Sequence, residues 1–202
     1  MPGSGYMFDK FKDECGVFGI FGHPEAANMS YLGLYALQHR GQEGCGISAA
    51  DGSSIRTHVG GGLVADVFKD NKIFNRLPGQ AAIGHVRYST AGGDSLKNCQ
   101  PITVNYSRGS IAVAHNGNLV NAQEVRFELE KSGSIFSTTA DTEVIVHLLA
   151  RSQADALADR MAEALRAVRG AYSLVFLTET RMVAVRDPSG FRPLVLGKVD
   201  GA

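Results

Sequence analysis

The chain has 202 residues, which suits one large domain or two small ones, and its twenty Lys and Arg residues balance twenty Asp and Glu residues. This neutrality argues against a nucleic-acid-binding protein or one drawn to an acidic membrane, and no apolar run is long enough to cross a bilayer. Residues 1–12 lack the apolar core of a secretory signal, and three widely spaced cysteines argue for a reducing, cytoplasmic setting rather than a disulfide framework.

The first part of the chain alternates short apolar runs with Gly, Asp and Asn turn signals. One longer segment has apolar residues at helical spacing and predicts a helix over 26–38. The strands predicted here are 17–21, 46–50, 55–58, 81–88 and 110–115.

The second part is first helical and then returns to strands. The predicted helices are 122–132, 141–151 and 154–168, and the predicted strands are 171–178, 182–186 and 193–196. Residues 137–139 are capping candidates for the second of these helices, with Asp141 in its first turn. Strands at both ends with helices between them predict one α+β domain, in which antiparallel sheets carry helices on their outer faces.

Cys15 begins the first predicted strand, directly after a short polar leader. This position suits a thiol that becomes N-terminal once residues 1–14 are removed. Its own α-amine, which titrates near ~8, would then accept the thiol proton. The structural alternative is that Cys15 is a small buried hydrophobic residue at a strand start.

Arg87 and Asp141 are candidates for binding the two charged groups of an amino acid. Arg87 stands where a strand gives way to a loop of small residues, so its guanidinium can bind a carboxylate with two hydrogen bonds. Asp141 precedes a predicted helix and can hold an ammonium group. The alternatives are a surface ion pair for Arg87 and simple stabilisation of the helix dipole for Asp141.

Asn116 and Gly117 follow an apolar strand, where Asn-Gly commonly forms a tight turn. The same pair can direct a side-chain amide and a backbone N–H at one point and so form an oxyanion hole. His39 and Arg40 end the first predicted helix, and we expect both to cap its last carbonyl groups, where they could also brace the active site.

Five segments, in this order, resemble the amidophosphoribosyltransferase family. They are Cys-Gly-Val-Phe-Gly-Ile at 15–20, Leu-Gln-His-Arg-Gly-Gln at 37–42, Gly-His-Val-Arg-Tyr-Ser-Thr-Ala-Gly at 84–92, His-Asn-Gly-Asn-Leu-Val-Asn at 115–121 and Thr-Ala-Asp-Thr-Glu at 139–143. The resemblance runs from Cys15 nearly to the C-terminus. It implies a glutaminase domain with the N-terminal-nucleophile (Ntn) hydrolase fold, a four-layer αββα sandwich of antiparallel sheets, and a leader over 1–14 that is removed as a propeptide.

Carried over by motif, the resemblance makes Cys15 the nucleophile, with its freed amine as general base. Asn116 and Gly117 match the oxyanion hole. Arg87 matches the residue that binds the α-carboxylate of L-glutamine, and Asp141 matches the residue that binds its α-amino group.

Two further positions have matching roles. Arg40 corresponds to a supporting residue near the nucleophile, and Thr90 lies in the glutamine-binding loop of the family. The implied reaction hydrolyses glutamine through a thioester, and the complete family enzyme uses the ammonia with phosphoribosyl pyrophosphate to make phosphoribosylamine, the first step of de novo purine synthesis.

The complete family enzyme has a second, phosphoribosyltransferase domain, for which we find no counterpart in this sequence. We therefore expect residues 15–202 to be a glutaminase domain incomplete at its C-terminus. The histidines and cysteines show no metal-ligand spacing, and the Mg²⁺ and [4Fe–4S] cluster implied for full-length members are expected beyond this chain. We expect a homo-oligomer in the full-length form, a packing role for Cys45, and an exposed, reactive Cys99.

Two alternatives remain at this point. One is the glutaminase domain of another Ntn amidotransferase, such as glucosamine-6-phosphate synthase or asparagine synthetase, which share the Cys-Gly start and the Asn-Gly pair. The other is a catalytically silent precursor, because an uncleaved leader locks the amine of Cys15 in a peptide bond.

Overall fold

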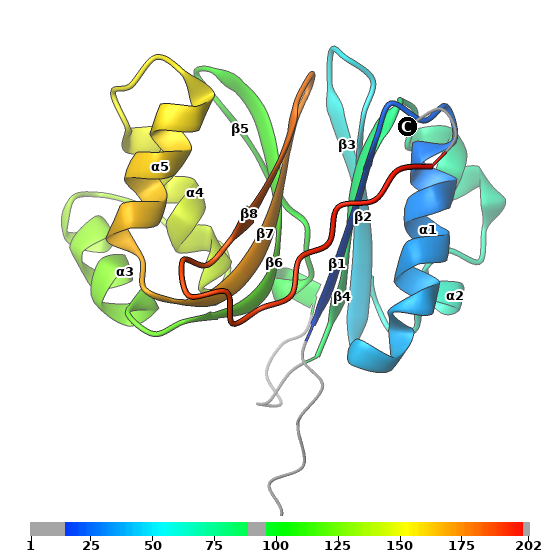
Figure 1. Ribbon diagram of the computed structural model, residues 1–202, viewed down its shortest axis with the longest axis horizontal. Helices are drawn as coiled ribbons and strands as arrows, with labels where there is room; N and C mark the ends of the chain where they lie inside the picture. The colour runs from blue at the N-terminus through cyan, green and yellow to red at the C-terminus, as the bar shows by residue number, and fades with distance from the viewer. Residues whose placement is uncertain (1–14, 89–95, 200–202) are drawn as a thin grey trace, which may run out of the picture.

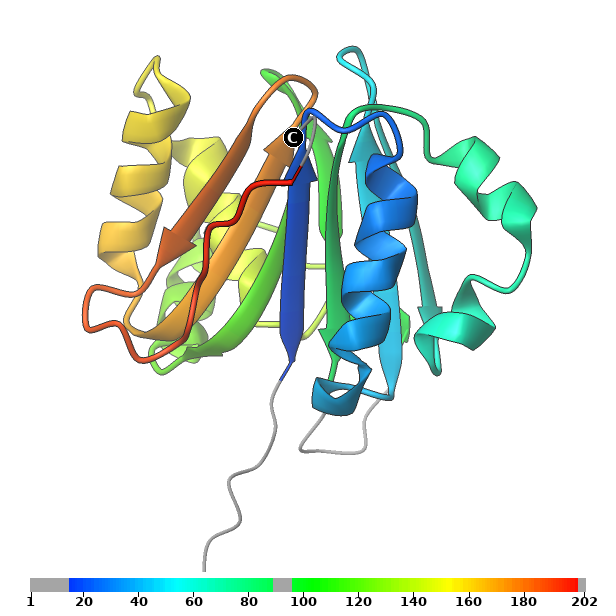
Figure 2. The same ribbon diagram turned by 45° about the vertical axis from the view of Figure 1, so that its right-hand side comes forward.

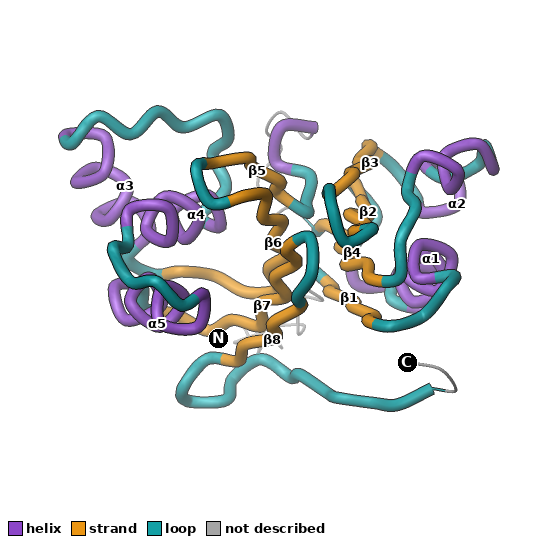
Figure 3. The backbone as a smooth tube through the Cα atoms, turned by 90° about the horizontal axis from the view of Figure 1, so that it is seen from above, coloured by secondary structure: helices purple, strands orange, loops and turns teal. Residues whose placement is uncertain are grey.

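The computed structural model describes residues 15–88 and 96–199 and has four layers. Two four-stranded antiparallel sheets pack face to face, and helices cover the outer face of each (Figure 1). The view from above shows the same order of helices, sheet, sheet and helices (Figure 3). The predicted αββα sandwich is therefore confirmed.

The first sheet has the strand order β1-β4-β2-β3 and is covered by α1 and α2. Its elements are β1 (Gly16–Phe21), α1 (Ala26–Ala36), β2 (Gly44–Ala50), β3 (Ile55–Gly61), α2 (Val64–Val67) and β4 (Ala81–Arg87). Within the described ranges, 3-10 helices lie between α1 and β2 (η1, Gln38–Arg40), between α2 and β4 (η2, Asn71–Arg76) and between β4 and the first strand of the second sheet (η3, Leu96–Asn98).

The second sheet has the order β5-β6-β7-β8, and α3, α4 and α5 cover it. Its elements are β5 (Ile102–Tyr106), β6 (Gly109–Leu119), α3 (Ala122–Lys131), α4 (Thr142–Arg151), α5 (Leu157–Ala167), β7 (Gly170–Thr178) and β8 (Met182–Arg186). Within residues 15–88 and 96–199, no helix has the length and apolar character to span a membrane.

Side-chain alternation along the strands divides the core into three clusters. On β6, Ile111 and Val113 pack among the residues of α4 and α5, whereas Ala112 and Ala114 face the first sheet. The layer between the sheets consists largely of Ala residues with Ile83, Val175 and Leu177. These small side chains let the two sheets approach closely, so backbone groups of one sheet come within reach of side chains of the other.

The structure corrects three expectations about local structure. Residues 193–199 form neither strand nor helix and run as an extended segment past β8 toward α1 (Figure 2). Pro193 has no N–H to donate to a ladder, and its carbonyl accepts the hydroxyl of Ser173 at 2.9 Å. The strand β5 was not predicted, although its sequence, Ile-Thr-Val-Asn-Tyr, alternates with period two. Asn116 and Gly117 lie inside β6 and not in a turn.

Candidate active site

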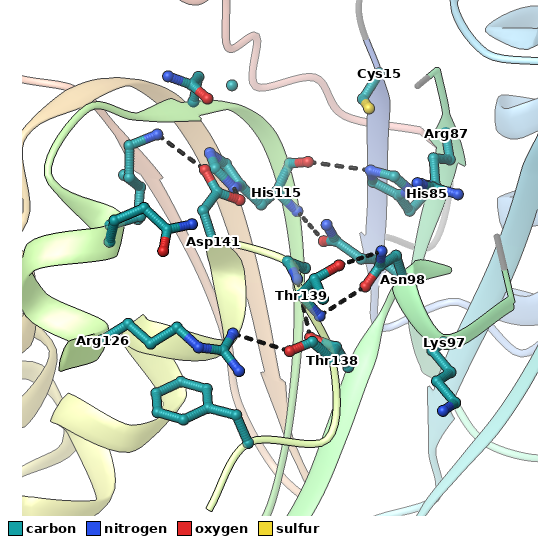
Figure 4. A pocket seen from close by; sticks show the side chains of 18 of the residues that line it. Cys15, His85, Arg87, Lys97, Asn98, His115, Arg126, Thr138, Thr139 and Asp141 are labelled. Atoms are coloured by element: carbon teal, nitrogen blue, oxygen red, sulfur yellow. Dashed lines mark hydrogen bonds and ion pairs between the residues drawn. The ribbon is translucent and has the colours of Figure 1, made fainter. Parts of the chain in front are cut away.

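A cavity of about 860 Å³ lies where β1 begins, β4 ends and β6 passes between α4 and the first sheet. Cys15, Arg87, Gly117 and Asp141 all line it. Cys15 and Arg87 come from one wall and Asp141 from the opposite wall (Figure 4). Four of the residues predicted from sequence are thus brought to one cavity by four separate elements, β1, β4, β6 and α4.

Cys15 stands immediately before β1, which pairs with β4 from Gly16↔Val86 onward. Its sulfur lies 3.6 Å from the carbonyl oxygen of Tyr88, to which the thiol donates, and accepts the Tyr88 N–H at 3.4 Å. Burial raises the pKa of the Cys15 thiol, and the hydrogen bond from the Tyr88 N–H and the charge of Arg87 only partly offset this effect. The thiol is therefore neutral at physiological pH and needs a base to become a nucleophile.

The segment that follows α1 contacts the backbone of Cys15 and that of Arg87, at the end of the neighbouring strand β4. Arg40 donates from Nε to the carbonyl of Cys15 at 3.2 Å, so it braces the candidate nucleophile rather than capping α1. His39 does contact the end of α1, with Nδ1 3.1 Å from the carbonyl of Ala36. A Cβ on Gly41 would lie 2.5 Å from the carbonyl carbon of Arg87, so only glycine permits this approach.

One edge of β6 is left open at the cavity. The strand pairs with β5 only as far as Val113, yet continues to Leu119. The N–H of Val120 donates to the carbonyl of Arg169, in the same register that pairs β6 with β7. Hydrogen bonds in an antiparallel pair alternate along the strand, so the even-numbered residues of β6 direct their N–H groups to β7. The N–H groups of the odd-numbered residues therefore face the open edge. Side chains occupy part of that edge: Gln100 Oε1 accepts the N–H of His115 at 2.8 Å.

Gly117 is the next odd-numbered residue, and its N–H faces the cavity with no strand opposite among the described residues. Its φ of 152° lies where residues with side chains are rarely found. A Cβ at this position would lie 2.1 Å from the carbonyl oxygen of Ala171, so a backbone donor is presented here by a residue that must be glycine.

Asn116 faces the space between the sheets, on the same side of β6 as Ala114. It is buried, and its carboxamide oxygen has no hydrogen-bond partner within residues 15–88 and 96–199. Asn116 itself does not line the cavity. Its role in an oxyanion hole therefore stays a prediction, whereas Gly117 reaches the cavity directly.

Asp141 precedes α4 and bonds to the same edge of β6. Its Oδ2 accepts the N–H of Leu119 at 2.9 Å, and its Oδ1 lies 3.4 Å from Nδ1 of His115. Burial acts to raise the pKa of Asp141, but the interactions with His115 and the N–H groups of Leu119 and Thr142 outweigh burial and lower it. Asp141 is thus an ionised carboxylate at the cavity wall, suited to a cation.

The loop before α4 is held by a carboxylate in the first turn of the helix. Glu143 accepts hydrogen bonds from the N–H and hydroxyl groups of both Ser137 and Thr138, at 2.7–2.9 Å. Two of the three predicted capping residues therefore donate to Glu143, and no side-chain oxygen of the described residues caps α4. Asn98 adds two bonds to Thr139, so the loop that carries Asp141 is fixed from two sides.

Sequence reasoning missed the side chains that connect these groups: His85, Gln100, His115 as a contact of Asp141, and Thr142. No local signal distinguishes them from packing residues. Cys99, expected to be exposed, is buried, with its sulfur 3.6 Å from the carbonyl of Gly60. Cys45 is buried in the core, as predicted. Thr90 lies outside the described residues.

Comparison with known proteins places these features in context. A family model described as a glutamine amidotransferase domain matches residues 85–202. The chain is 55% identical over 190 residues to amidophosphoribosyltransferase 3, chloroplastic, of Arabidopsis thaliana, and 49% identical over 191 residues to the Bacillus subtilis amidophosphoribosyltransferase; each match covers 94% of this chain. It spans only 36% and 40% of those two proteins.

A solved structure gives the same picture. The glutamine phosphoribosylpyrophosphate amidotransferase from B. subtilis, in complex with ADP and GMP, matches with a TM-score of 0.82 and 48% identity, over 88% of this chain and 38% of that one. These similarities confirm the resemblance predicted from the five motifs.

Proposed function

Because the chain belongs to the glutamine amidotransferase domain family, we propose that it is the glutaminase part of an amidophosphoribosyltransferase. It would hydrolyse L-glutamine to glutamate and ammonia. The observation that carries this proposal is that four groups meet at one cavity. They are the sulfur of Cys15, the N–H of Gly117, which no strand pairs with among the described residues, the guanidinium of Arg87 and the ionised carboxylate of Asp141. The guanidinium and the carboxylate can pair with the α-carboxylate and α-ammonium of a free amino acid. The sulfur and the N–H can attack and polarise an amide at the end of its side chain.

The mechanism assigns one role to each group. With the leader removed, the α-amine of Cys15 accepts the thiol proton, and the sulfur attacks the δ-carbonyl carbon of glutamine. The N–H of Gly117 and the carboxamide of Asn116 stabilise the oxyanion of the tetrahedral intermediate. The C–N bond breaks, the protonated amine returns its proton to the leaving nitrogen, and ammonia departs. Water then hydrolyses the γ-glutamyl thioester to glutamate and regenerates the thiol.

Arg87 and Asp141 bind the substrate in this scheme. Arg87 pairs with the α-carboxylate and Asp141 with the α-ammonium, so the side-chain amide is directed at Cys15. Arg40 holds the carbonyl of Cys15 and fixes the sulfur during attack. Thr90 stays a proposed contact of glutamine.

The remaining steps of the family reaction belong to the longer proteins. Transfer of ammonia to phosphoribosyl pyrophosphate would need the part of the relatives that this chain does not span. A [4Fe–4S] cluster takes four thiolates, whereas the chain has three cysteines, and the described residues contain no group of three or more His, Cys, Asp or Glu side chains placed to hold a metal. Three cysteines do not supply the four thiolates of the cluster, and Mg²⁺ stays an expectation for the longer proteins. A cytoplasmic location, supported by the odd number and wide spacing of the cysteines, and a homo-oligomeric full-length form stay proposals.

The proposal is tested by comparing the processed chain, which begins at Cys15, with the unprocessed 202-residue chain. We expect glutamate and ammonia to be released from glutamine only by the processed form, because residues 1–14 convert the required amine into a peptide nitrogen. Intact mass establishes which form is present. Equal hydrolysis by a chain that retains its leader would contradict the mechanism, and no hydrolysis by either form would contradict the function.

A further inference from the structure

The open edge of β6 and the start of α4 are connected by one buried side chain, Gln100. Its Oε1 accepts the N–H of His115 at 2.8 Å, and its Nε2 donates to the hydroxyl of Thr142 at 3.0 Å. Gln100 is 6% exposed and Thr142 is fully buried. Both ends of this carboxamide are therefore used in the interior, one by a strand and the other by a helix.

The hydroxyl of Thr142 is the centre of this contact. Besides Gln100, Oγ1 lies 3.0 Å from Nδ1 of His115 and 3.4 Å from Oδ1 of Asp141. From the first sheet, Nε2 of His85 lies 3.1 Å from the carbonyl oxygen of His115. Residue 115 of β6 is thus held through its N–H, its carbonyl and its imidazole by three different elements.

These contacts join the two ends of the proposed glutamine site. His115 is two residues before Gly117 on the same open edge, and Thr142 is adjacent to Asp141. A chain of hydrogen bonds through Gln100 and Thr142 consequently ties the position of the candidate oxyanion donor to that of the carboxylate that would bind the α-ammonium.

We propose that Gln100 and Thr142 are positioning residues that set the spacing between Gly117 and Asp141, and so match the site to glutamine. The inference rests on the proposed function. Glutamine and asparagine carry the same groups and differ by one methylene. The distance between Asp141, which would bind the α-ammonium, and Gly117, which would bind the oxyanion, therefore decides which side-chain amide reaches the sulfur. A misplacement of about 1 Å in such a site costs on the order of 10²-fold in rate.

The test uses two replacements at Thr142. Thr142→Ser keeps the hydroxyl and Thr142→Val keeps the shape without it. In the processed full chain, we expect T142S to hydrolyse glutamine within about threefold of wild type, and T142V to lose at least about tenfold in kcat/KM. We also expect the ratio of kcat/KM for glutamine to that for asparagine to fall in T142V and to be retained in T142S.

A second variant and a second readout separate positioning from folding. Gln100→Met has a side chain of similar length but lacks both hydrogen bonds. It should lower the ratio of kcat/KM for glutamine to that for asparagine, as T142V does. Alkylation of Cys15 by iodoacetamide, which needs neither Asp141 nor Gly117, should proceed in T142V and Q100M at the wild-type rate if these variants are folded.

Four results are decisive. T142V with an unchanged substrate ratio would overturn the inference, and so would equal losses in T142S and T142V. Native alkylation of Cys45 and Cys99 in T142V and Q100M at the rates seen in urea would show a general loss of the fold and would also overturn it. Absence of glutamine hydrolysis in processed wild type would instead contradict the proposed function, and this inference with it.

Discussion

The N–H of Leu119 donates to Oδ2 of Asp141 at 2.9 Å, so the carboxylate that precedes α4 is bonded to the strand edge on which Gly117 lies two residues earlier. A helix and a strand that are separate in sequence therefore share one row of backbone groups. On this row the N–H of His115 is occupied by Gln100 and that of Leu119 by Asp141, with Gly117 between them facing the cavity.

Replacement of Asp141 by Asn should weaken glutamine binding. The change keeps an oxygen for the N–H of Leu119 but removes the charge that would pair with the α-ammonium. A hydrogen bond to a charged group contributes about 1.5–3 kcal/mol, so we expect KM for glutamine to rise about 10–100-fold. Steady-state kinetics of the processed chain measures this effect. Glu124→Gln, the same change at an exposed carboxylate, is the control; a D141N variant with the KM of wild type would remove Asp141 from the substrate site.

Replacement of Gly117 by Ala should damage both stability and hydrolysis. The added methyl group meets the carbonyl of Ala171 at 2.1 Å, at a φ of 152°, so the strand must shift and carry the donor with it. We expect a loss of more than about 2 kcal/mol in unfolding free energy, measured by urea denaturation. Gly52→Ala is the matched control, because Gly52 also has a positive φ but open space around it. Similar losses in the two variants would show that backbone strain alone acts at Gly117.

His85 should make the protein less stable as the pH falls. Burial lowers the pKa of His85 to about 3, with a smaller opposing effect from its bond to His115. The unfolded chain takes up this proton near pH ~6.5, so the stability from neutral His85 is present above that pH and is lost as the pH falls toward about 3. The slope from this one group is about 1.4 kcal/mol per pH unit.

The effect of His85 can be isolated with His85→Gln, which keeps a donor near the position of Nε2. Urea unfolding of wild type and H85Q at pH 5–7, above most carboxylate titrations, should show the slope in wild type and a flatter profile in the variant. Parallel profiles would contradict the buried, neutral state of His85.

The three thiols should react in a fixed order. Cys15 is half-buried at a cavity, whereas Cys45 and Cys99 are buried, and burial raises the pKa of Cys45 to about 12. We expect native iodoacetamide labelling, followed by peptide mass analysis, to modify Cys15 at least on the order of tenfold faster than the other two. In urea all three should react at similar rates. Fast native labelling of Cys99 would mean that its burial here is wrong.

The local pattern of apolar residues in the sequence predicts much of the fold. Apolar spacing located α1, α3, α4 and α5 to within a few residues, because each has a buried face that repeats at helical period. The pattern failed at 193–196, where apolar residues suggested a strand but no neighbouring strand pairs with them. It also failed at Asn116 and Gly117, because a pair common in turns lies here inside a long strand.

The sequence alone establishes which groups the site can use, because a thiol, a guanidinium, a carboxylate and an Asn-Gly pair are read directly from the order of residues. Only the tertiary structure decided that Gly117 presents its N–H to the cavity and that Gln100 and Thr142 contact His115, two residues before it. The reason is that this N–H is exposed where β5 ceases to pair with β6, and the extent of a strand pairing depends on contacts between distant residues, which no local spacing contains.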